Sequence, residues 1–326
     1  MQKKRLFLTI FTIVSVILSG CQAKASPPAS RTAFYLDTVI TITLYDVSSA
    51  DGELLLDDCM ALIESYENLF SKTIAGSDVW NINHSAGAAV TVHEDTERLL
   101  EVALSYAAQY DGIIDPAIGT LSALWDFNDT GNHLVPSPAE ITEALSHVSY
   151  KNIILEGNQV TLTDPDTRID LGFIAKGYIA DRLKAYLLSR NVNSAIINLG
   201  GNVLTIGRKP DGSPYQVGIQ KPFDERGATA LILSVSDTSL VSSGNYERYF
   251  ETDNTLYHHI LSTLDGYPVD SGLSQVTILS ENSVDGDALS TLCFILGYEK
   301  GRALIDSLPD VEAVFITKDD VIYQTW

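Results

Sequence analysis

Strand-like segments joined by short turns occupy much of the second half of this chain and constrain its fold. They dominate from Val203 to Leu279. Strands joined by short turns pair antiparallel, because parallel neighbours need a crossover of a dozen or more residues. Helix-like segments also occur, but they do not alternate strictly with strands. The sequence therefore predicts an α+β fold of largely antiparallel sheets with packed helices, not a doubly wound parallel sheet.

Periodicity predicts the individual elements. Alternation with β-branched residues predicts a strand over 34–45, and the polar stretch 71–87 is predicted to be a loop. Apolar residues at helical spacing predict the helices. These helices cover 52–70, 94–110, 141–147, 174–190, 287–296 and 300–308, and the further strands cover 152–162 (two strands), 194–199 and a closing strand at 314–316.

The first residues have the pattern of an export signal. A cationic start, Met1–Arg5, precedes an apolar run from Leu6 to Leu18 and then Ser19-Gly20-Cys21. The run is shorter than the ~20 residues that span a bilayer. Its ending resembles a bacterial lipobox, in which the cysteine is lipidated, although a plain cleaved signal or an uncleaved anchor would also fit.

We therefore expect a signal peptide over 1–20, a lipidated tether over 21–31 and a folded domain over 32–326. The tether is small, polar and proline-containing, without an apolar pattern. The expected location is the outer, extracytoplasmic face of the cell membrane, held by lipid on Cys21.

The net charge of the chain restricts the ligands and partners that it can bind. The chain has 21 basic and 42 acidic residues, a net charge of −21. Such a field opposes nucleic acid, whose binding needs clustered lysine and arginine. An anionic ligand would need local help from a metal, a helix N-terminus or placed cations. Cys59 and Cys293 lie in apolar, helix-like segments and are predicted to be buried thiols, with a disulfide as the alternative.

Two glycine-containing turns are candidate binding segments. Residues 169–178 form a strand end, a turn and a helix start with Lys176, where backbone N–H groups favour phosphate oxygens. Gly200 and Gly201 follow a buried strand and permit close approach of a ligand to the backbone. An ordinary strand-to-helix turn and a simple hairpin turn are the structural alternatives.

Two further segments carry polar chemistry. His258 and His259 are adjacent in a predicted strand, so they point to opposite faces and at most one enters a given site. Asp287 and Thr291 are four residues apart at a helix start, so their oxygens share one face. They suit a hard divalent cation, although Asp287 could simply oppose the helix dipole.

The order of these segments, IDLGFIAKGY, INLGGN, SSGNYERYF with YHHI, and DALST, resembles the ApbE family of FAD:protein FMN transferases. The similarity extends upstream to Leu36-Asp37-Thr38, to a polar loop with Ser71, Ser77 and Asn83, and to Ile114-Asp115-Pro116 with Gly119 and Trp125. It covers the chain from Phe34 to about Leu296 and again implies an α+β fold.

The resemblance implies an activity. In this family a threonine hydroxyl of an acceptor protein attacks FAD, which is bound with Mg²⁺, so that AMP leaves and FMN stays on the threonine. The acceptors are flavoproteins of membrane-associated electron-transfer systems. Two alternatives stay open: a Mg²⁺-dependent FAD pyrophosphohydrolase giving FMN and AMP, and a lipid-anchored flavin-binding protein without turnover.

The resemblance also implies the roles of individual residues. His259 would be the catalytic base, and the metal would be held by the carbonyl of Phe173 with Asp287 and Thr291. The sequence departs from the family at Leu36 and Thr73, where methionine and tyrosine are usual, and Ser262-Thr263 replaces an Asp-Pro pair. The expected FAD-binding residues are Leu36, Thr73, Ile114, Asp115, Asp170, Lys176, Asn198, Gly200, Gly201, Ser243, Gly244, His259 and Ile260.

Overall fold

The structure is a computed structural model, which describes residues 27–127 and 134–326. The predicted signal peptide and the lipidation site, Cys21, lie outside the described residues. Within the described ranges no helix is both long enough and apolar enough to traverse a bilayer.

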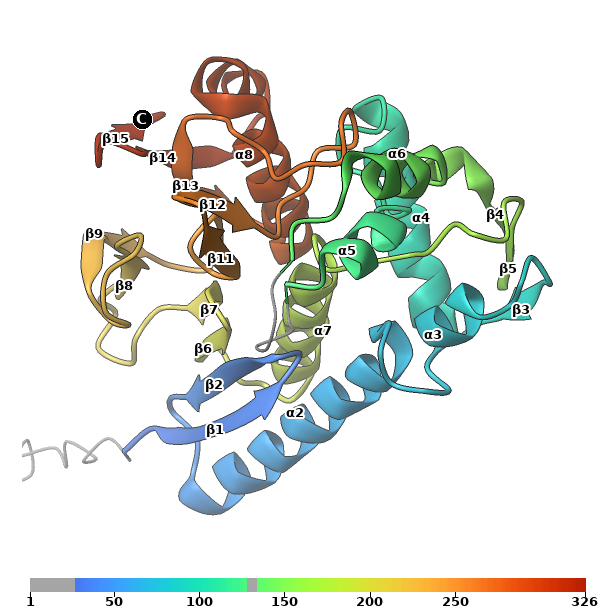
Figure 1. The fold of residues 1–326 in the computed structure, drawn as a ribbon. Helices are drawn as coiled ribbons and strands as arrows, with labels where there is room; N and C mark the ends of the chain where they lie inside the picture. Colours follow the sequence, from blue (N-terminus) through green and yellow to red (C-terminus); the bar gives the residue numbers. More distant parts are fainter. Residues whose placement is uncertain (1–26, 128–133) are drawn as a thin grey trace, which may run out of the picture.

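An eight-stranded sheet organises the molecule (Figure 1). Its strand order is β1-β2-β6-β7-β10-β13-β14-β15, and each neighbouring pair is antiparallel. This confirms the predicted α+β class. The strands are β1 (Ala29–Tyr35), β2 (Thr38–Leu44), β6 (Ser194–Leu199), β7 (Asn202–Gly207), β10 (Ser239–Gly244), β13 (Leu273–Ser280), β14 (Glu312–Thr317) and β15 (Ile322–Gln324).

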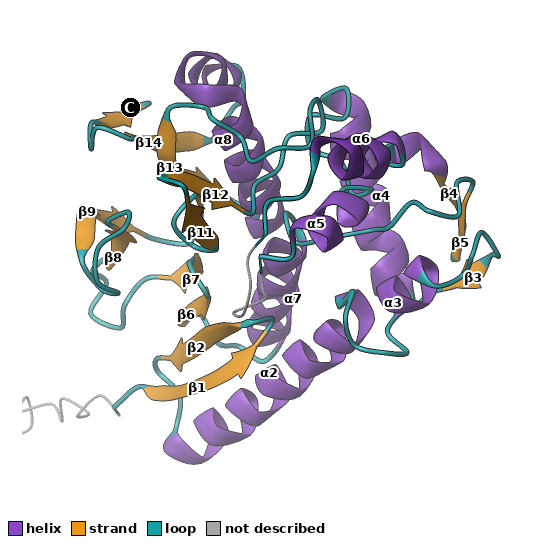
Figure 2. Cartoon of the chain, in the orientation of Figure 1, coloured by secondary structure: helices purple, strands orange, loops and turns teal. Residues whose placement is uncertain are grey.

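Three long helices cover one face of this sheet (Figure 2). α2 (Ser49–Phe70) packs on β1, α7 (Ala175–Ser189) on β6 and β7, and α8 (Ser283–Asp306) on β10 and β13. Ser48 caps α2 by accepting the N–H of Asp51 at 3.2 Å. The helices and the sheet bury one large apolar core.

A hairpin covers the opposite face of the sheet. It consists of β8 (Tyr215–Gln220) and β9 (Thr229–Val235), and it encloses a second core with Leu279 and Val314. β13 is therefore buried along its whole length.

Smaller elements gather beside this framework. They are α3 (Asp78–Asn83), β3 (Val90–Thr91), α4 (Glu94–Gln109), α5 (Gly119–Trp125), α6 (Pro138–Ser146), the 3₁₀ turn η1 (Tyr150–Asn152), β4 (Ile153–Glu156) and β5 (Gln159–Leu162). The hairpin of β11 (Tyr249–Thr252) and β12 (Thr255–His258) packs on α5 and α6 through a third core.

Several predicted elements differ from the observed ones. The single strand over 34–45 is a hairpin, because Leu36 and Asp37 both adopt φ of 55°. Such a turn normally carries glycine, asparagine or aspartate, and here only Asp37 fits this preference. β1 also includes Ala29–Arg31, which the sequence assigns to the tether.

Other differences concern short elements. The predicted loop 71–87 contains α3, which Ser77 caps by accepting the N–H of Trp80 at 3.0 Å. The predicted closing strand is β14, and β15 follows it. The two helices predicted at 287–296 and 300–308 form α8, which starts at Ser283 and is interrupted at Gly297 by a non-helical φ of 76°. Cys59 and Cys293 are buried free thiols, as expected.

Candidate functional site

A close crossing of α7 and α8 builds the centre of the predicted site. A Cβ at Gly177 would lie 2.4 Å from the carbonyl oxygen of Ser283, so a glycine is needed here. The crossing brings Asp287 of α8 to the first turn of α7, where its Oδ2 accepts the N–H of Gly177 at 2.9 Å. The glycine that sequence analysis placed in a phosphate-binding turn therefore positions a carboxylate.

The same contact leaves a backbone carbonyl free. In a regular first turn the N–H of Gly177 would bond the carbonyl of Phe173, four residues earlier. Because that N–H bonds Asp287, no backbone N–H in the described ranges donates to the Phe173 carbonyl. Phe173 and Asp287 therefore both present oxygens at the start of α7.

Asp287 is a deeply buried carboxylate near the start of α8. It is 4% exposed and forms no ion pair within the described part of the chain. Burial raises the pKa of Asp287, and the positive charge of Lys176 and the N–H donors oppose this. A buried carboxylate beside a free carbonyl suits a hard cation such as Mg²⁺, which prefers oxygen ligands.

Hydroxyl groups complete this oxygen-rich region. Thr291 lies one turn after Asp287, as predicted, and its Oγ1 is 3.1 Å from Ser243 Oγ of β10. Ser243 Oγ also lies 2.8 Å from Ser290 Oγ. The structure thus brings together Asp287, Thr291 and Ser243 from α8 and β10. Gly244, next to Ser243, lies against the Ser274 carbonyl, where a Cβ would be at 2.9 Å.

The turn between β1 and β2 and the turn between β6 and β7 lie beside each other. Gly200, with φ of 65°, connects β6 to β7, and a Cβ there would lie 2.2 Å from Thr38 Oγ1. Asn198 Oδ1 accepts the N–H of Gly201 at 3.1 Å. Gly200 and Gly201 thus form the hairpin turn between β6 and β7, with a close approach to Thr38 at the start of β2, and their contact with FAD stays a prediction. Leu36, in the β1–β2 turn, donates its N–H to Glu67 Oε1 at 2.6 Å.

The adjacent histidines have different environments. His258 is 4% exposed, its Nε2–H donates to the Val269 carbonyl at 3.0 Å, and burial lowers its pKa to about 4. It is therefore a neutral structural histidine. His259 is only partly buried, and its Nδ1 lies 3.3 Å from the Arg248 carbonyl. Because a carbonyl only accepts, Nδ1 carries the proton and Nε2 keeps a free lone pair.

Lys176 links His259 to Asp287 electrostatically. Burial lowers the pKa of His259, and the charges of Arg248 and Lys176 lower it further. Lys176 also acts on the Asp287 carboxyl group. A neutral imidazole with a free lone pair therefore lies near a lysine and a buried carboxylate, all predicted from the sequence to share one site.

Asp170 has a partner that sequence analysis missed. Its Oδ2 lies 2.6 Å from Nζ of Lys72 and accepts the Ser122 hydroxyl at 2.8 Å, and its Oδ1 accepts the N–H of Gly172. Burial raises the pKa of Asp170, but Lys72 and these donors hold it at about 2. Lys72 is 98 residues away in the sequence, so no local pattern signals the pair.

Of the expected FAD-binding residues, Ile114, Asp115 and Ile260 are buried, and Thr73 lies exposed in a loop. Ile114 and Ile260 are core residues, 3% and 5% exposed. Asp115 accepts the N–H groups of Ala117 and Tyr150, and burial raises its pKa. Thr73 is exposed, with its hydroxyl 3.1 Å from Ser71 Oγ. Contact of these residues with FAD stays a prediction.

A surface cluster of His147, Asp164 and Asp166 also has ligand-type atoms close together. His147 Nδ1 lies 2.7 Å from Asp164 Oδ2. This hydrogen bond raises the pKa of His147, and it accounts for the arrangement without an ion. The cluster includes none of the predicted metal ligands.

Comparison with known proteins relates most of the chain to one family. The model of the ApbE family matches residues 36–315. The chain is 40% identical over 297 residues to an FAD:protein FMN transferase of Klebsiella pneumoniae, covering 90% of each, and 34% identical over 307 residues to that of Treponema pallidum, covering 89% and 84%. Its structure matches the ApbE protein of Thermotoga maritima with a TM-score of 0.85 and 31% identity, covering 92% and 97%.

Proposed function

This chain belongs to the ApbE family, and we propose that it transfers FMN from FAD to a threonine hydroxyl of an acceptor protein, with AMP as the leaving group and Mg²⁺ as the required metal. The chain is a transferase, as its relatives are named. The observation that carries the metal requirement is the buried carboxylate of Asp287 beside the Phe173 carbonyl, since within the described ranges the carboxylate forms no ion pair and the carbonyl accepts no backbone N–H.

Residues at the start of α7 would bind the phosphates. Lys176 supplies a positive charge in the first turn, where the helix dipole also favours anions. Phe173, Asp287 and Thr291 would hold Mg²⁺. When bound, this ion would neutralise charge on the phosphate oxygens, which is the main requirement of phosphoryl transfer.

His259 would activate the nucleophile. Its Nδ1–H is directed to the Arg248 carbonyl, so Nε2 is free to accept the proton of an incoming hydroxyl. The threonine oxygen would then attack the phosphorus on the FMN side, and the bond to AMP would break. The lowered pKa of His259 keeps the imidazole neutral, and so ready to act as a base, at neutral pH.

Hydrolysis of FAD is the second candidate. The His259 side chain is partly exposed to solvent. The same Nε2 could therefore activate water, releasing FMN and AMP without an acceptor.

The decisive experiment compares Asp287→Ala with wild-type protein. Purified protein is incubated with FAD, Mg²⁺ and membranes of its own host, and covalent flavin is detected by in-gel fluorescence. We expect a loss of at least about 100-fold, because removing a metal ligand removes charge neutralisation in the transition state. Asp306→Ala, at the exposed far end of α8, is the matched control. Full transfer by Asp287→Ala would contradict the metal assignment, and no labelling by wild-type protein would contradict the transferase proposal.

We also propose that lipid on Cys21 holds the enzyme at the outer face of the membrane. Such a tether would raise the effective concentration of membrane-associated acceptors, which we propose are electron-transfer flavoproteins. Cys21→Ser should move the protein from the membrane fraction to the soluble extracytoplasmic fraction. If the variant stays membrane-bound, the anchor is not a lipid on this cysteine.

A further inference from the structure

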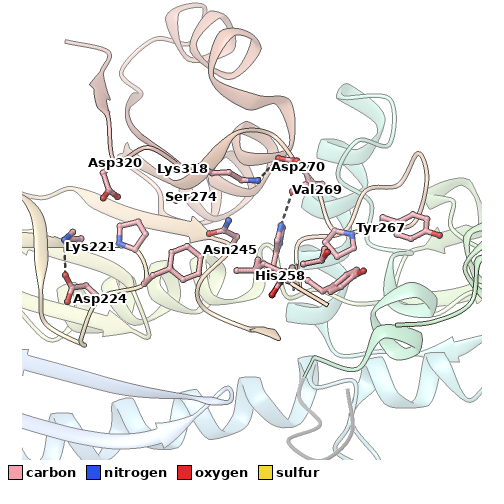
Figure 3. Close-up of a pocket in the computed structure, with 17 residues that line it drawn as sticks. Lys221, Asp224, Asn245, His258, Tyr267, Val269, Asp270, Ser274, Lys318 and Asp320 are labelled. Carbon is pink, nitrogen blue, oxygen red and sulfur yellow. Dashed lines mark hydrogen bonds and ion pairs between the residues drawn. The ribbon is translucent and has the colours of Figure 1, made fainter. Parts of the chain in front are cut away.

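A cavity lies beside the β11–β12 hairpin, and Figure 3 shows the residues that line it. We call it the hairpin groove; its volume is about 680 Å³, within the range of ligand sites. Four segments form its walls: residues 221–224 after β8, residues 254–258 of the β11–β12 hairpin, the loop 267–270 and residues 318–320 after β14. None of the residues assigned above to FAD or metal lines it.

The floor of the hairpin groove is polar and buried. Asn245, His258 and Ser274 all line it, and each is 4% exposed. Asn245 Oδ1 has no hydrogen-bond partner among the described residues. A buried acceptor is almost always paired in folded proteins, so this oxygen, which belongs to a residue that lines the groove, calls for a donor, and a turn of the Asn245 side chain would offer it to a ligand there.

Charge at the rim argues against an anionic ligand. Lys221 lies 3.0 Å from Asp224, and Lys318 lies 2.7 Å from Asp270, so each lysine is neutralised. Asp320 adds one further negative charge. The groove therefore differs from a phosphate site and suits an uncharged ligand with N–H donors, of which a polypeptide backbone is the general example.

Phe223 gives the rim an exposed aromatic side chain. It is 49% exposed and adopts φ of 57°, which is rare for a bulky residue. Its ring lies 5.4 Å from that of Tyr249 and 6.0 Å from that of Tyr246, both edge-on. Strained residues occur mainly at functional sites, and exposed aromatic residues often contribute most to protein interfaces.

We propose that the hairpin groove binds an extended segment of the acceptor protein, close to the threonine that receives FMN. This inference rests on the proposed transferase function. His258 in the groove floor and His259 in the reaction site are consecutive, so their Cα atoms are about 3.8 Å apart. Their side chains point to opposite faces of the strand, so an acceptor segment in the groove would pass round the edge of the two-stranded β11–β12 hairpin to present its threonine to His259.

The test measures acceptor and FAD kinetics separately. The acceptor is the host membrane protein that becomes flavin-fluorescent with wild-type enzyme, prepared as a purified domain. Phe223→Asn removes the ring and tolerates the left-handed backbone, and Asn245→Ala removes the unpaired acceptor. We expect Phe223→Asn to raise KM for the acceptor about 10- to 30-fold, and Asn245→Ala about 5-fold. KM for FAD and the rate of FAD hydrolysis in water should not change.

Leu54→Ala is the matched control, since Leu54 is 65% exposed on α2, away from the groove. Unchanged acceptor KM in both groove variants would overturn the inference while leaving the transferase function intact. A parallel rise in KM for FAD, or a lowered unfolding midpoint in Asn245→Ala, would show a structural role and would also overturn it. If wild-type enzyme labels no acceptor, the inference falls together with the proposed function.

Discussion

Replacing Lys72 by methionine tests how much the ion pair between Lys72 and Asp170 stabilises the folded protein. Lys72 follows α2, and its Nζ lies 2.6 Å from Asp170 Oδ2 and 3.0 Å from Ser122 Oγ. The side chains of Lys72 and Asp170 are 32% and 19% exposed, so the pair is neither fully buried nor freely solvated. Methionine keeps the length and apolar stem of lysine but removes the charge, leaving Asp170 without a cation.

Two estimates of the stability lost on removing Lys72 are of the same order. Exposed ion pairs contribute about 0.2–1 kcal/mol, and removing one partner of a buried pair costs about 3–5 kcal/mol, so this pair falls near 2 kcal/mol. The pKa of Asp170 is held at about 2, against an ordinary value of 3.8. At 1.36 kcal/mol per pKa unit, this difference corresponds to about 2 kcal/mol, a net value of the same order in which burial opposes Lys72, Ser122 and the Gly172 N–H.

The sign of the pH dependence follows. A carboxyl group with a depressed pKa stabilises the fold above its unfolded pKa, and this contribution is lost as the pH falls towards 2. Lys72→Met should therefore lower the free energy of unfolding by about 2 kcal/mol at pH 7. The difference between variant and wild type should shrink below about pH 4.

Urea denaturation of four proteins is the assay: wild type, Lys72→Met, Asp170→Asn and the double variant. Because Asp170→Asn removes the uncompensated charge, the double variant should be about 1–2 kcal/mol more stable than the sum of the single changes predicts. KM for FAD should also rise in Lys72→Met, since an unpaired carboxylate would lie beside an anionic substrate. Additive effects within about 0.5 kcal/mol would refute the reasoning.

Two further predictions concern the framework of the site. Gly177→Ala would place a Cβ 2.4 Å from the Ser283 carbonyl, so it should lower the free energy of unfolding by about 1–3 kcal/mol in urea and reduce transfer; unchanged stability would contradict the helix crossing. The folded pKa of His258, about 4, lies below its unfolded value of 6.5, so the unfolded state binds the extra proton between these pH values. Stability should therefore fall by up to about 3 kcal/mol from pH 6.5 to 4, and His258→Phe should lose this part of the pH dependence.

Regular periodic segments were the predictable part of the fold. β6 was predicted with its observed bounds, Ser194–Leu199, and α7 within one residue at each end. The hairpin turn at Leu36 and Asp37 was missed because its left-handed backbone is imposed by packing and by the hydrogen bond to Glu67, not by glycine. α3 was missed because six residues give too short an apolar pattern.

In the candidate site, sequence spacing predicted which residues of one helix lie together. It did not predict which residues of different elements are in contact. Asp287 and Thr291 share a helix face because four residues make about one turn. The contact of Asp287 with Gly177 and the pairing of Lys72 with Asp170 join residues about 100 positions apart. No periodicity encodes such contacts, because they depend on how α7 packs against α8 and how the loop after α2 meets the strand end at Asp170.

These long-range contacts explain how a chain of net charge −21 can hold a pyrophosphate. Lys72 neutralises Asp170, and Lys176 forms no ion pair within the described ranges, so its charge is available to a phosphate. Asp287 forms no ion pair within the described ranges, and although Lys176 offsets part of its charge, the carboxylate would repel the same phosphate. FAD and Mg²⁺ should therefore bind cooperatively, each removing the charge that opposes the other. The affinity for FAD should fall sharply when Mg²⁺ is chelated, and Asp287→Asn should make FAD binding largely independent of the metal.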